Sequence, residues 1–263
     1  MPVQVEISGF RVFSAFRGYQ SVLSQMSSAW QIAVPFPTLG DNDVHIWKCD
    51  LLAKQASLLS PDEQERADRF KVEQPGRQFC NARSTLRRLL GSYLGCSPQD
   101  LAFDYGEHGK PAIGKPASDI QFNVSHSHDL ALLAFSNKLP LGIDIEWFDR
   151  KTEVEPLAKR FYSESEQAEM NALPSEERHA AFLRCWTRKE AYLKAHGSGL
   201  SRDTRTFSVC STGGLIADER DSNAPSQWSI EGLDPDGDYC AALAVRSTLA
   251  NVSLFLVSQD SLT

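Results

Sequence analysis

Short stretches in which apolar and polar residues alternate recur along this chain, and stretches with helical periodicity divide them into two groups. Alternation with a period of two is typical of strands with one buried face, and apolar residues three or four apart are typical of amphipathic helices. The order is a strand, helices, several strands, then helices and strands again. Two α+β halves are the simplest partition of such an order.

In the first group, strands are predicted at VHIWKCDL (44–51), LAFDY (from Leu101), IQFNVSHS (from Ile120), LALLAFS (from Leu130) and LGIDIEW (141–147). In the second group, they are predicted at FSVC (from Phe207), WSIEGL (from Trp228), YCAALAV (from Tyr239) and VSLFLVS (from Val252). Helices are predicted at 60–70, 78–95, 156–173 and 176–197, the first because a serine N-cap, a proline and acids follow one another. The segments from Gly106 to Pro116 and over 211–227 are expected to be loops.

The chain of 263 residues is long enough for about two compact units at roughly 150 residues each. We expect an N-terminal extension over 1–43, an N-terminal half over 44–147 and a C-terminal half over 148–263. The composition of residues 12–34 fits an amphipathic surface extension, with an organelle transit segment as the alternative.

Composition excludes several classes of function. A net charge of −7 argues against a nucleic-acid-binding protein, and no apolar stretch reaches the roughly 18 residues of a membrane span. Six cysteines form no CxxC pair, which fits buried thiols in the reducing cytoplasm. Residues 66–88 hold seven bases and two acids, so they form either a basic patch for an acidic partner or phosphate, or solvated helix faces.

Two acids lie close together in the segment LGIDIEW. On a strand Asp144 and Glu146 share one face about 7 Å apart, while Ile143 and Ile145 point into the core. Carboxylates so placed repel each other unless a cation or solvent intervenes. The alternative for this pair alone is the polar face of an edge strand.

A third acid comes from the helix that contains CWTRKEAYLKA (185–195). Trp186, Glu190 and Lys194 follow at i, i+4 and i+8, so Glu190 and Lys194 share a face, although a plain surface pair would have the same spacing. Magnesium prefers a few protein oxygens and takes the rest from water and phosphate. The three acids therefore indicate a Mg²⁺ site on a diphosphate.

Four motifs occur in a fixed order, namely GKP (109–111), FNVSH (122–126), GIDIE (142–146) and WTRKEAYLK (186–194). In this order they resemble the Sfp-type 4′-phosphopantetheinyl transferases, and the resemblance extends from about His45 to the carboxyl terminus. It implies a pseudo-symmetric, monomeric pair of similar halves that binds coenzyme A in the cleft between them.

The resemblance also implies a reaction. A serine hydroxyl of an apo acyl or peptidyl carrier protein attacks the β-phosphorus of coenzyme A, and adenosine 3′,5′-bisphosphate leaves. Asp144, Glu146 and Glu190 match the metal-binding acids of the family. Glu190 also matches the proposed general base, acting directly or through water, and Lys194 matches the phosphate-contacting lysine.

The cofactor-binding residues are matched in the same way. They are Lys110 and Pro111 in the nucleotide loop, Arg83 and Ser84 on a helix, and Ser125 with His126, which matches the histidine at the ribose 3′-phosphate; Arg66 is a looser match. Ser125 and His126 do not suggest a hydrolase pair, because adjacent side chains on a strand point to opposite faces.

Two other functions remain open alongside the transferase. One is a Mg-dependent nucleotide diphosphate hydrolase that uses the same carboxylates, and the other is a module that binds coenzyme A or a carrier protein. The pathway of the carrier, in fatty-acid, polyketide or nonribosomal-peptide synthesis, is also open.

Overall fold

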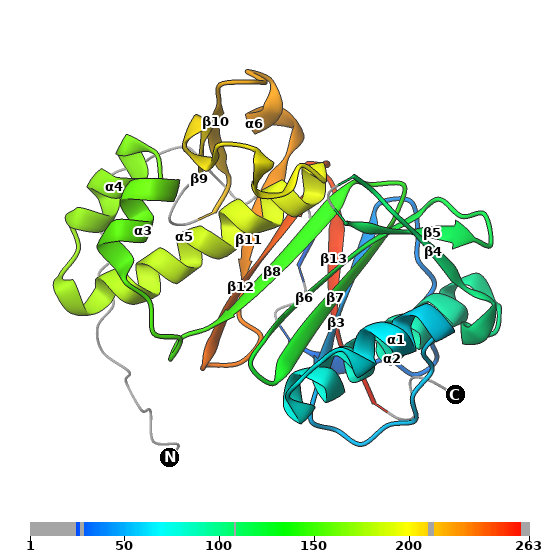
Figure 1. Ribbon diagram of the computed structural model, residues 1–263. Coiled ribbons are helices and arrows are strands. Elements are labelled where there is room, and N and C mark those ends of the chain that lie inside the picture. Colours follow the sequence, from blue (N-terminus) through cyan, green and yellow to red (C-terminus); the bar gives the residue numbers. More distant parts are fainter. Residues whose placement is uncertain (1–24, 27–28, 108, 210–212, 259–263) are drawn as a thin grey trace, which may run out of the picture.

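The computed structural model describes residues 25–26, 29–107, 109–209 and 213–258. Its elements, shown in Figure 1, are β1 Gln25–Met26, β2 Gln31–Ile32, β3 Asp43–Asp50, α1 Pro61–Asp68, α2 Glu73–Leu94, β4 Ala102–Tyr105, β5 Pro111–Lys115, β6 Ile120–Ser127, β7 Leu130–Asn137, β8 Leu141–Trp147, α3 Val154–Phe161, α4 Glu164–Asn171, α5 Ser175–His196, β9 Phe207–Val209, β10 Leu215–Asp218, α6 Ala224–Gln227, β11 Ser229–Leu233, β12 Tyr239–Val245 and β13 Asn251–Leu256. Of the predicted extension over 1–43, residues 1–24 and 27–28 lie outside the part of the chain that the structure describes.

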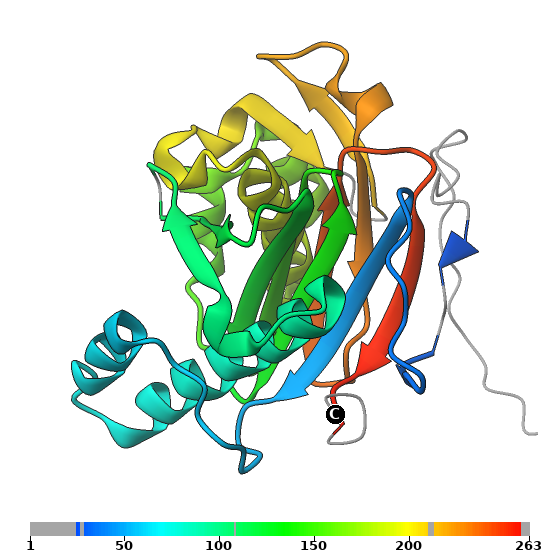
Figure 2. The ribbon, with the colours of Figure 1, turned by 90° about the vertical axis from the view of Figure 1, so that its right-hand side faces the viewer.

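One half of the molecule is built on β3, β7 and β6, which pair in that order as an antiparallel sheet. Helix α2 covers one face of it, packing Leu86, Leu89 and Leu90 against Trp47 and Phe122. Figure 2 shows this half from its own side, with α2 lying across the strands. The last strand, β13, pairs in parallel with β3, so the end of the chain returns to this sheet.

The other half repeats the same arrangement with β8, β12 and β11. Helix α5 covers this sheet and packs Ala191, Leu193 and Ala195 against residues of β11 and β12. The inner faces of the two sheets share a further core, in which Ile143 and Ile145 of β8 are buried as the alternation in LGIDIEW predicts.

The two halves correspond in detail. Helices α2 and α5 both have 22 residues and both end at a glycine with positive φ. Arg87 and Lys189, each seven residues before the end of its helix, make buried ion pairs with Glu63 and Glu166 at 2.7 Å. These acids also complete the capping boxes of α1 and α4. The α+β fold of two similar halves is therefore confirmed.

Strand β8 and helix α5 are in direct backbone contact. A Cβ atom at Gly142 would overlap the carbonyl oxygen of Ala191 and the amide nitrogen of Ala195. Only glycine fits at this point, so the glycine of the GIDIE motif sets how closely the strand with two acids approaches the helix with the third.

Several predicted elements are wrong in detail. The helix predicted over 156–173 is two helices, α3 and α4, because Tyr162 has an extended backbone and Ser163 caps a new helix. The segment from Gly106 contains strand β5, and 211–227 contains β10 and α6 in its described part. Their turn-forming residues are interspersed with short apolar runs that gain strand pairing only in the tertiary structure.

Strand pairing also bears on the expected boundary after residue 147. Strand β8 pairs with β12 of the C-terminal sheet, whereas β13 pairs with β3 of the N-terminal sheet. Strand pairing thus favours a boundary between the halves before β8, with β13 returning to the N-terminal sheet. No helix in the described part of the chain is long and apolar enough to cross a bilayer.

Candidate active site

The two halves meet where β6 lies beside β8. Every second residue of β6 presents a polar side chain to β8: Asn123 accepts a hydrogen bond from the backbone amide of Ile143 at 2.8 Å, and Ser127 accepts one from that of Trp147 at 3.1 Å. Between them, Ser125 donates its hydroxyl to Asp144 at 2.8 Å. The polar positions of FNVSHS therefore join the halves, and the predicted acids lie along this junction.

Asp144 is 5% exposed and stands at the centre of the site. Its Oδ1 accepts hydrogen bonds from the Ser125 hydroxyl and from the Lys194 ammonium, at 2.8 and 2.7 Å. Lys194 also donates to the Ser125 oxygen at 2.9 Å. The other oxygen of Asp144, Oδ2, is buried without a hydrogen-bond partner.

Glu146, 9% exposed, is held by two neighbours. Ser127 donates to its Oε2 at 3.3 Å, and Arg150, in the turn after β8, forms an ion pair with its Oε1. Sequence reasoning missed Arg150. Its spacing of four residues from Glu146 would suggest a pair on a helix, but here a turn after a strand brings the two together.

Glu190 faces these two acids from α5. The pKa of Glu190 is raised to about 7, chiefly by burial and then by the negative charges of Asp144 and Glu146, while the Lys194 ammonium opposes the shift. Its Oε1 is buried without a hydrogen-bond partner. Glu190 therefore lies within electrostatic range of Asp144 and Glu146.

These oxygens fit a hard divalent cation in their chemistry. Two buried carboxylate oxygens, one on Asp144 and one on Glu190, accept no hydrogen bond from the described part of the chain, and magnesium prefers such ligands. In the present arrangement Lys194 and Arg150 neutralise two of the acids. Among the described residues no three His, Cys, Asp or Glu side chains are gathered as a ready metal cluster.

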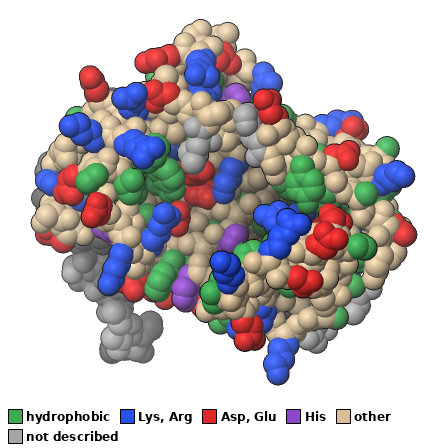
Figure 3. Space-filling view, in the orientation of Figure 1, with side chains coloured by type: hydrophobic (Ala, Val, Ile, Leu, Met, Phe, Trp, Pro, Cys, Tyr) green, Lys and Arg blue, Asp and Glu red, His purple; other side chains and the backbone are tan. Residues whose placement is uncertain are grey.

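Side chains on either side of the acids border a hollow between the halves. In Figure 3 acidic, basic and histidine side chains gather in this hollow. His126 points to the opposite face of β6 from Ser125 and is exposed, while Ser125 is buried. The pKa of His126 is lowered, first by partial desolvation of the ring and then by the nearby Lys194 ammonium.

A cavity of about 510 Å³ lies beside the GKP motif, between the β4–β5 hairpin and the end of α5. Pro111 lines it together with His196 and Gly197. Lys110 also lines this cavity, and its ammonium donates to the carbonyl oxygens of Leu141 and Lys194, at 3.1 and 2.7 Å.

The predicted residues of α2 lie in two different settings. The guanidinium of Arg83 stacks over Phe103 and approaches Glu63 at 3.5 Å, with its Nη1 buried and without a hydrogen-bond partner. Ser84 is 1% exposed and accepts a hydrogen bond from the amide of Leu58 at 3.0 Å. Its hydroxyl is thus engaged inside the protein, away from any ligand surface.

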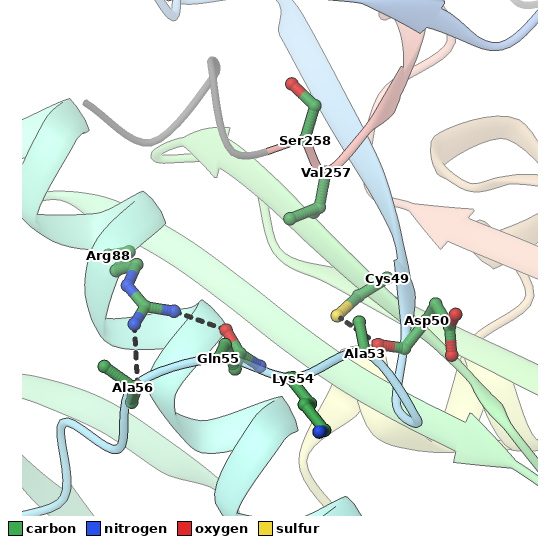
Figure 4. A pocket seen from close by; sticks show the side chains of 9 residues that line it. All are labelled: Cys49, Asp50, Ala53, Lys54, Gln55, Ala56, Arg88, Val257 and Ser258. Carbon is green, nitrogen blue, oxygen red and sulfur yellow. Dashed lines mark hydrogen bonds between the residues drawn. The ribbon is translucent and has the colours of Figure 1, made fainter.

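A second cavity, of about 300 Å³, lies in the N-terminal half beside β3 and α2 (Figure 4). Arg88 lines it, at the position of α2 that corresponds to Glu190 in α5, and bonds Gln55 and the carbonyl of Ala56. Trp47 and Cys49 project from β3 toward α2, as Asp144 and Glu146 project from β8 toward α5. Among the described residues, the group of three acids therefore occurs in one of the two similar halves, the one that contains β8 and α5.

Comparison with known proteins places the chain among related sequences. Residues 140–244 match the 4′-phosphopantetheinyl transferase superfamily, and residues 47–138 match the N-terminal region of 4′-phosphopantetheinyl transferases. The 4′-phosphopantetheinyl transferase HetI of Nostoc sp. is 38% identical over 84% of this chain and 94% of its own length. This chain belongs to the 4′-phosphopantetheinyl transferase family.

Two further relatives match a smaller share of the chain. The 4′-phosphopantetheinyl transferase Sfp of Bacillus subtilis is 30% identical over 68% of this chain and 79% of its own length. The 4′-phosphopantetheinyl transferase AcpT of Salmonella typhimurium is 44% identical over 42% and 56%. Among solved structures, a holo-[acyl-carrier-protein] synthase of Thermotoga maritima covers 41% of this chain and 62% of its own, with 22% identity and a TM-score of 0.33.

The position of the acids within this phosphopantetheinyl transferase follows from its two-part match. The boundary between the two matched regions, 138 and 140, falls immediately before β8. The acids on β8 and α5 belong to the second region, and Ser125, His126 and Lys110 belong to the first. The site therefore uses residues from both matched regions.

Proposed function

We propose that this protein transfers the 4′-phosphopantetheine arm of coenzyme A to a serine of an apo acyl or peptidyl carrier protein, in a Mg²⁺-dependent reaction that releases adenosine 3′,5′-bisphosphate. The main support is the junction where Asp144 pairs with Lys194 and where Asp144, Glu146 and Lys194 all lie within electrostatic range of Glu190. One buried oxygen of Asp144 and one of Glu190 have no hydrogen-bond partner among the described residues. Membership of the family agrees with this chemistry.

Asp144, Glu146 and Glu190 would hold the Mg²⁺, and the ion would supply charge neutralisation on the diphosphate oxygens. Lys194 already lies against Asp144 at 2.7 Å, so it is placed to move its ammonium onto an incoming phosphate. In exchange, the diphosphate oxygens replace the carboxylate as its partner.

The transfer itself forms a bond between the carrier serine oxygen and the β-phosphorus and breaks the bond from that phosphorus to the bridging oxygen. The serine proton passes to Glu190, directly or through a water molecule. Burial raises the pKa of Glu190 to about 7 in the free protein, but a bound cation makes its carboxylate a weaker base, which favours the relay through water. The bridging oxygen leaves on adenosine 3′,5′-bisphosphate, with Lys194 balancing its charge.

The nucleotide of coenzyme A would occupy the cavity beside Pro111, and His126 would contact the ribose 3′-phosphate. The support is that the cavity lies next to the end of α5, while His126 is exposed within range of the Lys194 charge. Arg83, with an unused buried nitrogen, is a further candidate for a phosphate contact.

One chain supplies both sides of the junction, which favours a monomeric enzyme. The free cysteines among the described residues favour a reducing compartment such as the cytoplasm. Neither feature distinguishes among carriers of fatty-acid, polyketide or nonribosomal-peptide synthesis.

The test is to mix the protein with coenzyme A, Mg²⁺ and an apo carrier protein and to weigh the carrier by mass spectrometry. A phosphopantetheine increment on the carrier serine supports transfer. Breakdown of coenzyme A without carrier modification would instead identify a diphosphate hydrolase, and binding of coenzyme A without turnover would identify a binding module.

The residue assignments have their own test. Glu190→Gln should abolish transfer and leave the fold intact, whereas Glu177→Gln, exposed at the start of the same helix, should have no effect. Unchanged turnover in Glu190→Gln would remove this residue from the mechanism. His126→Ala should weaken the binding of coenzyme A more than the binding of its 3′-dephospho analogue. Equal losses of affinity for both ligands would reject the 3′-phosphate contact.

A further inference from the structure

The ammonium of Lys110 lies where three elements from both halves meet. Lys110 precedes β5 in the N-terminal half, and its Nζ donates to the carbonyl oxygen of Leu141 at 3.1 Å and to that of Lys194 at 2.7 Å. Leu141 begins β8, and Lys194 belongs to the last turn of α5. One side chain therefore links the hairpin to both elements that bear the acids.

These two bonds lie on either side of the closest approach of β8 and α5. At Gly142, directly after Leu141, a side chain would overlap the backbone of α5. The strand and the helix have no side-chain layer between them at this point that could fix their spacing. The Lys110 ammonium bonds a carbonyl on each element, and so it holds the two backbones together.

The charge of Lys110 suits this position. The last carbonyls of a helix carry partial negative charge, so a cation at the end of α5 is stabilising, and Lys110 adds a second donor to the Lys194 carbonyl, which also accepts the Gly197 amide at 3.2 Å. Burial lowers the pKa of Lys110 to about 8, and the ammonium form still predominates at neutral pH. Its two hydrogen bonds to the carbonyl oxygens of Leu141 and Lys194 occupy the ammonium inside the protein.

The two elements held by Lys110 bring the reacting groups together. Asp144 lies three residues after Leu141 on β8, and the side chain of Lys194 bonds Asp144 while its carbonyl bonds Lys110. We propose that Lys110 is a positioning residue: it holds β8 and α5 in register so that Asp144, Glu190 and Lys194 face the diphosphate together. This inference rests on the proposed function.

The same segment borders the proposed nucleotide cavity. Pro111 follows Lys110 directly and lines the cavity with His196 and Gly197, and Gly197 ends α5. A nucleotide in this cavity would rest on the segment that fixes the end of α5. Lys110 thus joins the part of the enzyme that would recognise the donor's nucleotide to the part that would transfer its phosphate.

Lys110→Met tests the proposal, because methionine keeps the apolar stem and removes the ammonium. We expect kcat for carrier modification to fall at least about tenfold, since small misplacements of reacting groups have such effects, while KM for coenzyme A changes less than about threefold. Lys110→Arg keeps a cationic donor and should recover part of kcat. The control, Lys115→Met, removes an exposed lysine from the same hairpin and should match the wild type.

A second measurement does not depend on turnover. Binding of Mn²⁺ in the presence of coenzyme A, followed by electron paramagnetic resonance, should weaken about tenfold in Lys110→Met because the acids lose their alignment. A large rise in KM with unchanged kcat would overturn the proposal and make Lys110 a direct ligand. A loss of thermal stability with kcat and Mn²⁺ binding unchanged would also overturn it, by showing a purely structural role.

The remaining outcomes are also decisive. If Lys110→Met fails to fold, Lys110→Arg is tested in its place. We then expect a smaller loss of kcat with KM for coenzyme A unchanged. An unchanged kcat would count against the proposal. A wild-type protein that transfers nothing would reject the proposed function. Mn²⁺ binding with coenzyme A would still decide the role of Lys110 in that case.

Discussion

Among single residues, Arg150 has the most direct influence on the acids. It pairs with Glu146, whose other oxygen accepts the Ser127 hydroxyl, so both oxygens of this carboxylate already have partners. A cation that uses Glu146 must displace the guanidinium. Arg150 therefore competes with the proposed metal for one of its three ligands.

Removing this competitor should strengthen cation binding to the free protein. We expect Arg150→Gln to raise the affinity for Mn²⁺ about fivefold. The reason is that the ion pair with the partly exposed guanidinium, which the cation must break, contributes roughly 1 kcal/mol. Titration with Mn²⁺, followed by electron paramagnetic resonance, measures this. Lys151→Gln removes the neighbouring exposed charge as a control, and equal tightening in both variants would show only a long-range charge effect.

The sequence was sufficient to predict the acids but not their partners. Alternation in LGIDIEW places Asp144 and Glu146 on one face, and the structure agrees, because Ile143 and Ile145 are buried in the core. The ion pair with Arg150 depends on a turn, and the inward course of Lys110 depends on the contact of two halves. Neither follows from periodicity, since both arise from tertiary packing.

At the level of elements, the corresponding ion pairs of the two halves show what fixes the long helices. Lys189 is 1% exposed and donates to both oxygens of Glu166, at 2.8 and 2.7 Å, and to the carbonyl of Phe207. It lies within the WTRKE motif next to Glu190. Its place in that motif is therefore explained by anchoring α5 to α4 and β9.

Loss of this ammonium should destabilise the protein strongly. We expect Lys189→Met to lower the free energy of unfolding by about 3–5 kcal/mol, because Glu166 would remain as an uncompensated buried charge. Urea denaturation measures it. Arg69→Met breaks an exposed pair with Glu65, 3.9 Å long, and should cost less than about 1 kcal/mol. A cost of that small size for Lys189→Met would contradict the anchoring role.

The contact of β8 with α5 gives a second prediction at this level. Gly142→Ala should lower the free energy of unfolding by more than about 2 kcal/mol, because the new methyl group must push two backbones apart. Carrier modification should fall as well, since Asp144 and Glu190 would separate. Gly237→Ala, with open space around it, is the control. Stability is measured by thermal unfolding, and a Gly142→Ala variant as stable as the wild type would show that α5 can shift freely.

At the level of the whole molecule, the sequence predicted two α+β halves but not how they join. The alternation in FNVSHS predicts a strand but not its neighbour, whereas Asn123 and Ser127 accept hydrogen bonds from backbone amides of β8 across the junction. Pairing of β13 with β3 was equally beyond a local pattern, because it joins the end of the chain to its first long strand. Contacts between residues distant in sequence decide both features.

The pH dependence of stability is also a property of the whole molecule, and His45 contributes to it. His45 is 4% exposed on β3, and its Nδ1 lies 2.8 Å from the hydroxyl of Tyr93, which also accepts the Trp47 indole. Burial lowers its pKa from 6.5 to about 4, with Asp43 opposing the shift. Between these values the unfolded chain binds a proton that the folded protein does not.

Stability from this residue is therefore present above pH 6.5 and is lost as the pH falls toward 4. A shift from 6.5 to about 4 corresponds to a loss of about 3 kcal/mol over that range. His45→Gln keeps an acceptor for Tyr93 and does not titrate, so its unfolding free energy, measured by urea denaturation at pH 7 and pH 4.5, should fall less than that of the wild type. Parallel losses in both proteins would show that His45 is already protonated, or accessible to protons, in the folded state.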